Sequence, residues 1–221
     1  GEIYNHAYLR ELLEKKGHSF ITDHSDTETI LLGYKEWGLD GLLKRIIGMF
    51  AFSIYDKKIE KVIFARDRLG VKPLYYTNYG EDYFFSSEIK SFESHPKINF
   101  SFNEENLFHH LTFRSLPAPY TLFNSIQKMQ AGEYLIFDLQ NNKLSKSSYW
   151  SPLKNSLETP SSLDRAYDIL DELLSESIED RMISDVPVGV FLSGGLDSGF
   201  IIEKLYRMHH KIDSFTVTYP N

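Results

Sequence analysis

The chain has 221 residues, which is enough for one large domain or two smaller ones. Apolar residues make up 42% of the sequence and charged residues 25%, so we expect a packed core and exclude global disorder. The net charge is −7 and no basic run is present, which argues against nucleic acid or an anionic membrane as the main partner.

The sequence contains no cysteine, which excludes a disulfide framework, a thiolate zinc site and a cysteine nucleophile within these residues. No apolar run approaches the roughly 20 residues that cross a bilayer, and no signal peptide is visible. We therefore expect a cytoplasmic protein. The sequence begins with Gly1 and stops at Asn221 just after a strand-like run, so we expect both ends to be cut from something longer.

Three helices are predicted at the start of the chain. Residues 7–16 have the apolar periodicity of a helix. Ser25 and Glu28 fit a capping box, in which a helix begins at the serine and the glutamate stands three residues further on. Gly38 closes this second helix, and residues 39–46 make a short third one.

From Gly48 onward the pattern changes to that of β-strands. The predicted strands cover residues 49–55, 61–65, 74–77, 83–86, 132–139 and 143–149. A further helix is predicted over residues 103–113. Short turns join neighbouring strands, which is typical of antiparallel pairing. Residues 1–149 are therefore predicted to form an α+β domain.

Residues 150–162 contain two Pro and four Ser, which is typical of a linker between domains. After the linker we predict a helix over 163–182, an apolar strand over 186–192 that is suited to burial on both faces, a helix over 197–209 and a strand over 212–218. Strand, loop, helix and strand in this order indicate the start of a parallel α/β sheet. Residues 163–221 are therefore predicted to begin a second domain.

A glycine-rich loop joins the apolar strand to the helix that follows. The loop consists of Ser193, Gly194, Gly195, Leu196, Asp197 and Ser198. The glycines allow backbone N–H groups to approach phosphate oxygens closely, and the positive end of the helix adds to the attraction. Both serines supply hydroxyl donors. A carboxylate beside phosphates needs a cation between them, so Asp197 indicates Mg²⁺.

Two plainer interpretations of the loop stay open. Asp197 could serve as the N-cap of its helix, and the glycines could serve only a tight turn. The loop is neither a Walker sequence, which continues with Gly-Lys-Ser/Thr, nor the Gly-x-Gly-x-x-Gly dinucleotide motif.

This hexapeptide resembles the signature of the ATP-pyrophosphatases, which activate an oxygen as an adenylate. Residues 184–192, directly before it, narrow the resemblance to glutamine-hydrolysing asparagine synthetases and their close relatives. By this resemblance the loop binds ATP, and Leu192 and Val217 frame the adenine.

The amino-terminal half agrees with the resemblance. Residues 1–5 and 25–28 are similar to two glutamine-pocket segments of class II glutaminases, whose nucleophile is the amino-terminal residue. The resemblance places Gly1, Glu2 and Asp26 in the pocket, with Asp26 holding the α-ammonium group of glutamine. Helix capping alone is the other interpretation of Asp26. Residues 48–52, 65–76 and 86–90 also match the family, and we interpret them as scaffold or as a wall between the domains.

The resemblance implies an incomplete α+β glutaminase domain of the amino-terminal-nucleophile type, followed by the start of an α/β ATP-pyrophosphatase domain. The family's nucleophile is a first-residue cysteine, so we expect no catalytic residue and no activity in these residues alone. The family reaction releases ammonia from glutamine, adenylates the β-carboxylate of aspartate with ATP and Mg²⁺, and joins the two. A homodimer is one option for assembly.

Three alternatives stay open. The same chemistry could act on another carboxylate, such as a sugar acid, a peptide or a β-lactam precursor. The protein could instead be a non-catalytic nucleotide-binding relative. The first domain could also belong to an amidotransferase of the phosphoribosyl type, although the second half of the sequence disfavours this.

Overall fold

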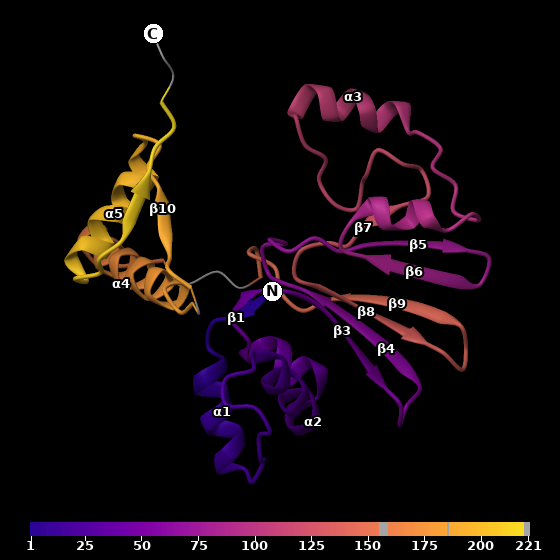
Figure 1. The fold of residues 1–221 in the computed structure, drawn as a ribbon, viewed down its shortest axis with the longest axis horizontal. Helices are drawn as coiled ribbons and strands as arrows, with labels where there is room; N and C mark the ends of the chain where they lie inside the picture. Colours follow the sequence, from indigo (N-terminus) through magenta and orange to yellow (C-terminus); the bar gives the residue numbers. More distant parts are fainter. Residues whose placement is uncertain (155–158, 185, 219–221) are drawn as a thin grey trace. The chain divides into compact units, whose positions relative to one another are not determined.

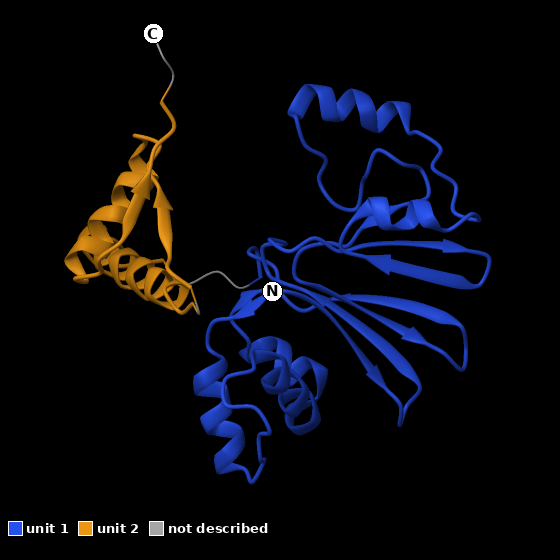
Figure 2. Ribbon diagram, in the orientation of Figure 1, with its two compact units in different colours: residues 1–156 blue, residues 157–221 orange. Residues whose placement is uncertain are grey.

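The computed structural model describes residues 1–154, 159–184 and 186–218. The chain divides into two compact units, residues 1–156 and residues 157–221, which are coloured separately in Figure 2. The predicted linker includes residues 155–158, which lie outside the described part, as does Asp185 just before the predicted strand. No helix in the described part is both long enough and apolar enough to cross a membrane.

The first unit begins with a two-residue strand and a helical pair. Strand β1 (Glu2–Ile3) leads into helix α1 (His6–Lys15), and helix α2 (Asp26–Arg45) follows after a loop. Gly38 interrupts α2 with a φ of 67° and a ψ of −179°, which lies outside helical geometry. The predicted break between the second and third helices at this glycine is therefore confirmed.

Two antiparallel sheets follow (Figure 1). The four-stranded sheet has the order β3 (Ala51–Asp56), β4 (Lys61–Arg66), β8 (Glu133–Asp138), β9 (Lys143–Ser148). The three-stranded sheet has the order β6 (Asp82–Ser86), β5 (Tyr75–Tyr79), β7 (Gln127–Lys128). The predicted hairpins and the α+β class of this unit are confirmed.

The four-stranded sheet is covered on both faces. Successive side chains of a strand point to opposite faces, so neighbouring residues of one strand join different clusters. Ile63 of β4 packs into a cluster with Leu9 and Leu42 of the helices. Its neighbour Phe64 belongs to a second cluster with Tyr76 of β5. The helices, the four-stranded sheet and the three-stranded sheet therefore form successive layers, as Figure 1 shows.

Several phenylalanines at strand spacing, which favours core positions over a binding platform, pack inside the unit. Phe50 is buried, and Phe52 packs against the same cluster. Phe85 stacks on Phe64 with ring centroids 3.7 Å apart, and Phe84 joins a third cluster. Strand-period aromatics supply large apolar area to a pleated surface, which explains this outcome.

Several short elements have no strong sequence pattern and were not predicted. They are β1, the short helix η1 (Ile89–Ser94) and β7, whereas the strand predicted over 49–55 is found as two strands, β2 (Gly48–Met49) and β3. The predicted helix over 103–113 is found as α3 (Glu104–Phe113), and none of its residues is buried.

The second unit contains α4 (Leu163–Arg181), β10 (Gly189–Phe191), α5 (Leu196–Arg207) and β11 (Asp213–Phe215). The two strands pair in parallel, with Gly189 opposite Asp213, so the predicted α/β class is confirmed. The expectation of a strand buried on both faces is wrong, because the side chain of Phe191 is 80% exposed. The sheet has two strands in the described part, and all three residues of β11 are exposed as well.

Candidate functional sites

The amino-terminal residues are held by a close pairing of β1 with β2, in which Glu2 lies opposite Met49 and Ile3 opposite Gly48. A Cβ atom added to Gly48 would lie 2.0 Å from the carbonyl oxygen of Glu2. A Cβ added to Gly1 would lie 2.8 Å from the carbonyl oxygen of Met49. Only glycine permits the two backbones to approach this closely.

Asp26 lies beside this strand pair. Its Oδ2 accepts a hydrogen bond of 3.1 Å from the backbone N–H of Ile3. The N-cap of α2 is Ser25, whose hydroxyl accepts from the N–H of Glu28 at 3.3 Å. Helix capping alone therefore does not account for Asp26, because its carboxylate reaches across to β1. Of the three residues expected in the glutamine pocket, Asp26 therefore contacts the strand that contains Glu2 and directly follows Gly1.

Asn5 fixes the carboxyl end of residues 1–5, a role that was not predicted. Its Nδ2 donates to the carbonyl of Arg45 at 2.8 Å, and its Oδ1 accepts from the N–H of Ile47 at 2.9 Å. The N–H of Tyr4 donates to the carbonyl of Ile47 at 2.8 Å. The amide nitrogen and the amide oxygen of Asn5 therefore both join the start of α1 to the end of α2, although 40 residues separate Asn5 from Arg45.

The loop after β4 is organised by two buried ionisable side chains, Arg66 and Asp67. The carboxylate of Asp67 accepts backbone N–H groups from Phe50, Leu69, Val71 and Lys72. The guanidinium of Arg66 donates to the carbonyls of Gly70, Lys72 and Met129. Burial lowers the pKa of Arg66. These contacts are internal to the fold, in agreement with the scaffold role expected of this segment.

In the second unit, the glycine-rich loop lies between the end of β10 and the start of α5. The backbone N–H of Leu192 donates to the carbonyl of Phe215 at 2.8 Å. The hydroxyls of Ser193 and Ser198 lie 3.1 Å apart, and Ser198 also accepts from the N–H of Ser193 at 3.3 Å. Gly194 has a φ of 77°, in the left-handed region that favours glycine.

The helix that follows begins at Leu196, its N-cap is Gly195, and Asp197 is in its first turn. The interpretation of Asp197 as the N-cap is therefore wrong, because the N-cap lies two residues earlier. Its exposed carboxylate remains beside the positive end of α5. The first N–H groups of any helix lack intrahelical partners, so this loop offers donors that suit phosphate oxygens.

The residues expected at the adenine lie on the neighbouring strand ends. Leu192 is half-buried, whereas Val217 is 73% exposed. The hydroxyl of Thr216 donates to the carbonyl of Leu192 at 2.8 Å, which joins the two chain segments. The structure thus places Leu192 and Val217 at the same end of the parallel pair.

Helix α5 is anchored by a contact that was not predicted. Lys204 is buried and pairs with Asp171 of α4, and its Nζ also lies 3.3 Å from the hydroxyl of Ser175. A buried ammonium requires such partners. Among the described residues, no group of three or more His, Asp or Glu side chains could hold a metal ion.

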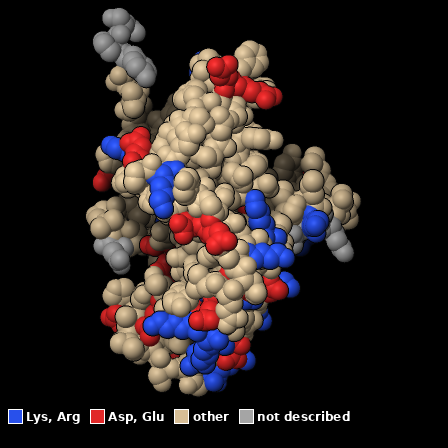
Figure 3. Space-filling view, turned by 90° about the vertical axis from the view of Figure 1, so that its right-hand side faces the viewer, with Lys and Arg blue, Asp and Glu red and all other residues tan. Residues whose placement is uncertain are grey.

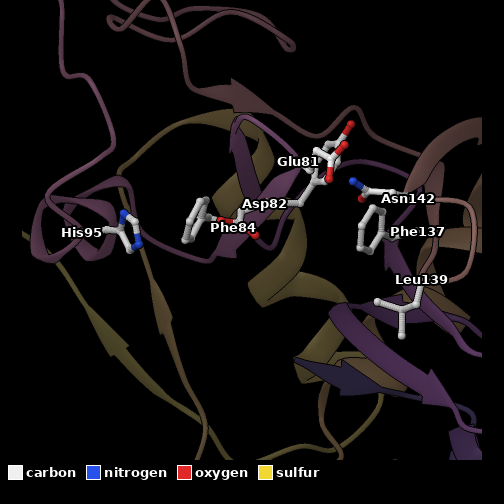
Figure 4. A pocket seen from close by; sticks show the side chains of 8 residues that line it. Glu81, Asp82, Phe84, His95, Phe137, Leu139 and Asn142 are labelled. Atoms are coloured by element: carbon white, nitrogen blue, oxygen red, sulfur yellow. The ribbon is translucent and has the colours of Figure 1, made fainter.

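A hollow of about 450 Å³ lies away from these residues, at the tips of the β5–β6 and β8–β9 hairpins. Figure 4 shows Glu81 and Asn142 at one end of it and Phe84 and His95 at the other. None of the predicted site residues lines this hollow. On the face drawn in Figure 3, acidic and basic side chains are interspersed, without a uniformly positive patch.

Family models match both parts of the chain. Residues 1–150 match the model described as a glutamine amidotransferase domain, and residues 169–221 match the model described as asparagine synthase. The chain belongs to the glutamine amidotransferase domain family, because that match covers more than half of its length. The second match and the relatives below confirm the predicted resemblance to glutamine-hydrolysing asparagine synthetases.

Three curated relatives show the range of the similarity. The chain is 35% identical over 217 residues to asparagine synthetase (glutamine-hydrolyzing) 1 of Bacillus subtilis, covering 98% of this chain and 33% of that protein. It is 39% identical over 212 residues to putative asparagine synthetase (glutamine-hydrolyzing) 2 of Methanocaldococcus jannaschii, covering 91% and 38%. It is 31% identical over 228 aligned positions to amidase chyE of Penicillium rubens, covering 100% and 32%. The chain spans about a third of the length of these relatives.

Proposed function

We propose that the protein transfers the amide nitrogen of glutamine to the β-carboxylate of aspartate, with ATP converted to AMP and pyrophosphate. The observation that carries this proposal is that one chain holds two different candidate sites, each in a part with its own family match. Asp26 lies against β1 in the part that matches glutamine amidotransferases. The glycine-rich loop lies at the start of α5, in the part that matches asparagine synthase.

In the proposed glutamine site, Asp26 binds the α-ammonium group, because a carboxylate is the strongest neutralising partner for that cation. Gly1 and Glu2 line the same pocket. A cysteine attacks the side-chain amide, releases ammonia and leaves a thioester that water hydrolyses. Since these 221 residues contain no cysteine, we propose that they are inactive by themselves and that the activity belongs to the full-length protein.

In the proposed ATP site, Leu192 and Val217 frame the adenine. Ser193, Gly194, Gly195 and Ser198 place N–H and hydroxyl donors around the phosphates. Asp197 would hold Mg²⁺, which neutralises charge on the departing pyrophosphate. Adenylation gives the β-carboxylate of aspartate a good leaving group, and ammonia then displaces AMP.

The remaining parts of the proposal concern organisation. We propose a glutaminase-like domain over residues 1–149, a linker over 150–162 and a nucleotide domain that begins at residue 163. The substrates are small molecules, namely glutamine, ATP and aspartate. A cytoplasmic location and assembly as a homodimer belong to the same proposal, and nucleic acid is not part of it.

A second candidate function keeps this chemistry and changes the acceptor. The similarity to amidase chyE motivates it. The chain is 31% identical to that protein and 35% identical to an asparagine synthetase, although the two relatives have different names. None of the side chains assigned above contacts the acceptor in the proposed mechanism, so they serve either acceptor equally well.

Pyrophosphate release by the full-length protein distinguishes the candidates. The protein is incubated with glutamine, ATP and Mg²⁺, without an acceptor, with aspartate, or with a panel of other carboxylates. We expect pyrophosphate and asparagine to appear in equal amounts only when aspartate is present. Release with another carboxylate instead would favour the second candidate, and no release with any acceptor would favour a non-catalytic relative.

A further inference from the structure

The side chain of Glu28 does something other than complete its capping box. It occupies the third position of α2, from which a glutamate usually accepts the backbone N–H of the N-cap residue. Here its carboxylate accepts from the loop before the helix instead. Oε1 accepts the N–H of Ile21 at 2.7 Å, and Oε2 accepts both the N–H and the hydroxyl of Thr22 at 2.8 and 2.5 Å.

The same loop is held a second time by Arg10 of α1. Its Nη1 donates to the carbonyl of Thr22 at 2.6 Å, and its guanidinium lies 4.3 Å above the ring of Phe20. Thr22 is therefore fixed through its N–H, its hydroxyl and its carbonyl. The hydrogen bond from the Thr22 hydroxyl, followed by those from the two backbone N–H groups, lowers the pKa of Glu28. The carboxylate is thus charged at neutral pH and binds these donors strongly.

These contacts start from a residue two positions after Asp26 on α2. Residues 18–24 contain no helix or strand, so side-chain contacts such as these determine where the loop lies. Asp26 and Glu28 belong to the same helical turn. The first holds β1 through the N–H of Ile3, and the second holds the loop. The first turn of α2 therefore holds both β1 and the loop that precedes the helix.

We propose that Glu28, supported by Arg10, is a positioning residue for glutamine binding, which holds residues 20–24 as a wall beside Asp26. This inference rests on the proposed function. Glu28 does not touch the substrate in this account. It acts by keeping the Asp26 carboxylate and the adjacent loop in one arrangement, because a binding site loses affinity when its walls must be ordered at the moment of binding.

The test is Glu28→Gln in the full-length protein. An amide has one acceptor oxygen, whereas Glu28 uses both oxygens for three donors. Glu36→Gln is the matched control, because Glu36 lies on the same helix and its carboxylate holds Lys16 at 2.7 Å and His18 at 2.8 Å. It lies ten residues, about 15 Å of helix, from Asp26.

Three quantities are measured for each variant. They are the KM for glutamine in glutamate release, the rate of pyrophosphate formation with ammonium salt in place of glutamine, and the hydrogen exchange of the amides in residues 18–24. For Glu28→Gln we expect a KM about tenfold higher, faster exchange at Ile21 and Thr22, and an unchanged rate with ammonia. For Glu36→Gln we expect the KM of the wild type. Partial recovery of the KM in Glu28→Asp, which keeps the charge, would further support positioning.

Three results would overturn the inference, and they are distinct. If Glu28→Gln loosens the loop and leaves the KM for glutamine unchanged, the loop is not a wall of the site and only this inference fails. If the wild type releases no glutamate from glutamine, the proposed function fails and this inference fails with it. An equal increase in KM in both glutamate variants would show a general loss of order in α2, which also contradicts a specific role for Glu28.

Discussion

At the scale of single residues, the structure depends on carboxylates whose partners are backbone N–H groups rather than cations. Asp67 is the fullest case, because it is buried and accepts four N–H groups from two segments. The sequence favoured a scaffold role for this residue through family similarity. It could not predict the hydrogen bonds, because they depend on where the chain near Phe50 returns in space.

Asp67→Asn should therefore destabilise the first unit by about 3 kcal/mol. The amide keeps one acceptor oxygen and buries an NH₂ group opposite N–H donors, which leaves polar groups without partners. The free energy of unfolding in urea measures the loss. Asp82→Asn is the control, because Asp82 is exposed at the start of β6 and should change the stability by less than about 0.5 kcal/mol. Equal stabilities of the two variants would contradict this account of Asp67.

A second residue-scale prediction concerns pH. The hydroxyl of Tyr34 donates to Asp56 at 2.8 Å and lowers the pKa of Asp56 below its ordinary value of 3.8. Burial, together with this hydrogen bond, raises the pKa of Tyr34 to about 12. The contribution of Asp56 to stability is present above pH 3.8 and is lost as the pH falls through its lowered pKa. That of Tyr34 is lost as the pH rises from 10 to about 12.

Tyr34→Phe should consequently move the pKa of Asp56 upward, toward 3.8. The side-chain carboxyl resonance of Asp56, followed by NMR through an acid titration, gives this pKa directly. Tyr55→Phe serves as the control, because Tyr55 precedes Asp56 in β3 and is more than half exposed. An unchanged Asp56 pKa in Tyr34→Phe would show that the hydrogen bond is not formed in solution.

At the scale of elements, long periodic segments could be predicted and short ones could not. Helix α4 was expected over 163–182 and is found at Leu163–Arg181. The hairpins were found for the same reason, since alternation and turn residues are local signals. Strands β1 and β2 have two residues each, and their pairing depends on a contact between residues 3 and 48 that no local pattern encodes.

Gly48→Ala tests that pairing. The added Cβ would lie 2.0 Å from the carbonyl oxygen of Glu2, so β1 must separate from β2. We expect a loss of about 3 kcal/mol or more in unfolding free energy, together with weaker glutamine binding. Gly199→Ala in α5 is the matched control, because its Cβ meets no atom within 4 Å and helical Ala is preferred over Gly by up to about 1 kcal/mol. Calorimetric melting gives the unfolding free energy of both variants. A Gly48→Ala protein as stable as the wild type would contradict the close approach of β1 to β2.

At the scale of the whole molecule, the two units differ in how much apolar surface they bury. The three clusters of buried side chains in the described part all lie within residues 1–156. In the second unit, Leu205 is the one buried apolar side chain among the described residues, while Phe191, Phe215 and Val217 are exposed. The sequence predicted the order of strand and helix there. It could not predict the exposure, because an apolar run implies burial only when other elements cover it.

Residues 1–156 should fold independently, and residues 157–221 should not. Produced separately, the first segment should unfold in one cooperative transition in urea, because its core is internal. The second should show helical circular dichroism without a cooperative transition, because a unit of this size with one buried apolar side chain among its described residues cannot offset its conformational entropy. A sharp transition in residues 157–221 alone would contradict this.

The central claim, that both sites serve one transfer of nitrogen, is tested most directly with glutamine labelled with ¹⁵N in its side-chain amide. The full-length protein is given this glutamine, ATP, Mg²⁺ and aspartate in the presence of unlabelled ammonium. The account predicts ¹⁵N in the side-chain amide of asparagine, with one pyrophosphate for each asparagine formed. Unlabelled asparagine would show that the glutamine site does not supply the ligase, and labelled ammonia without any asparagine would show that aspartate is not the acceptor.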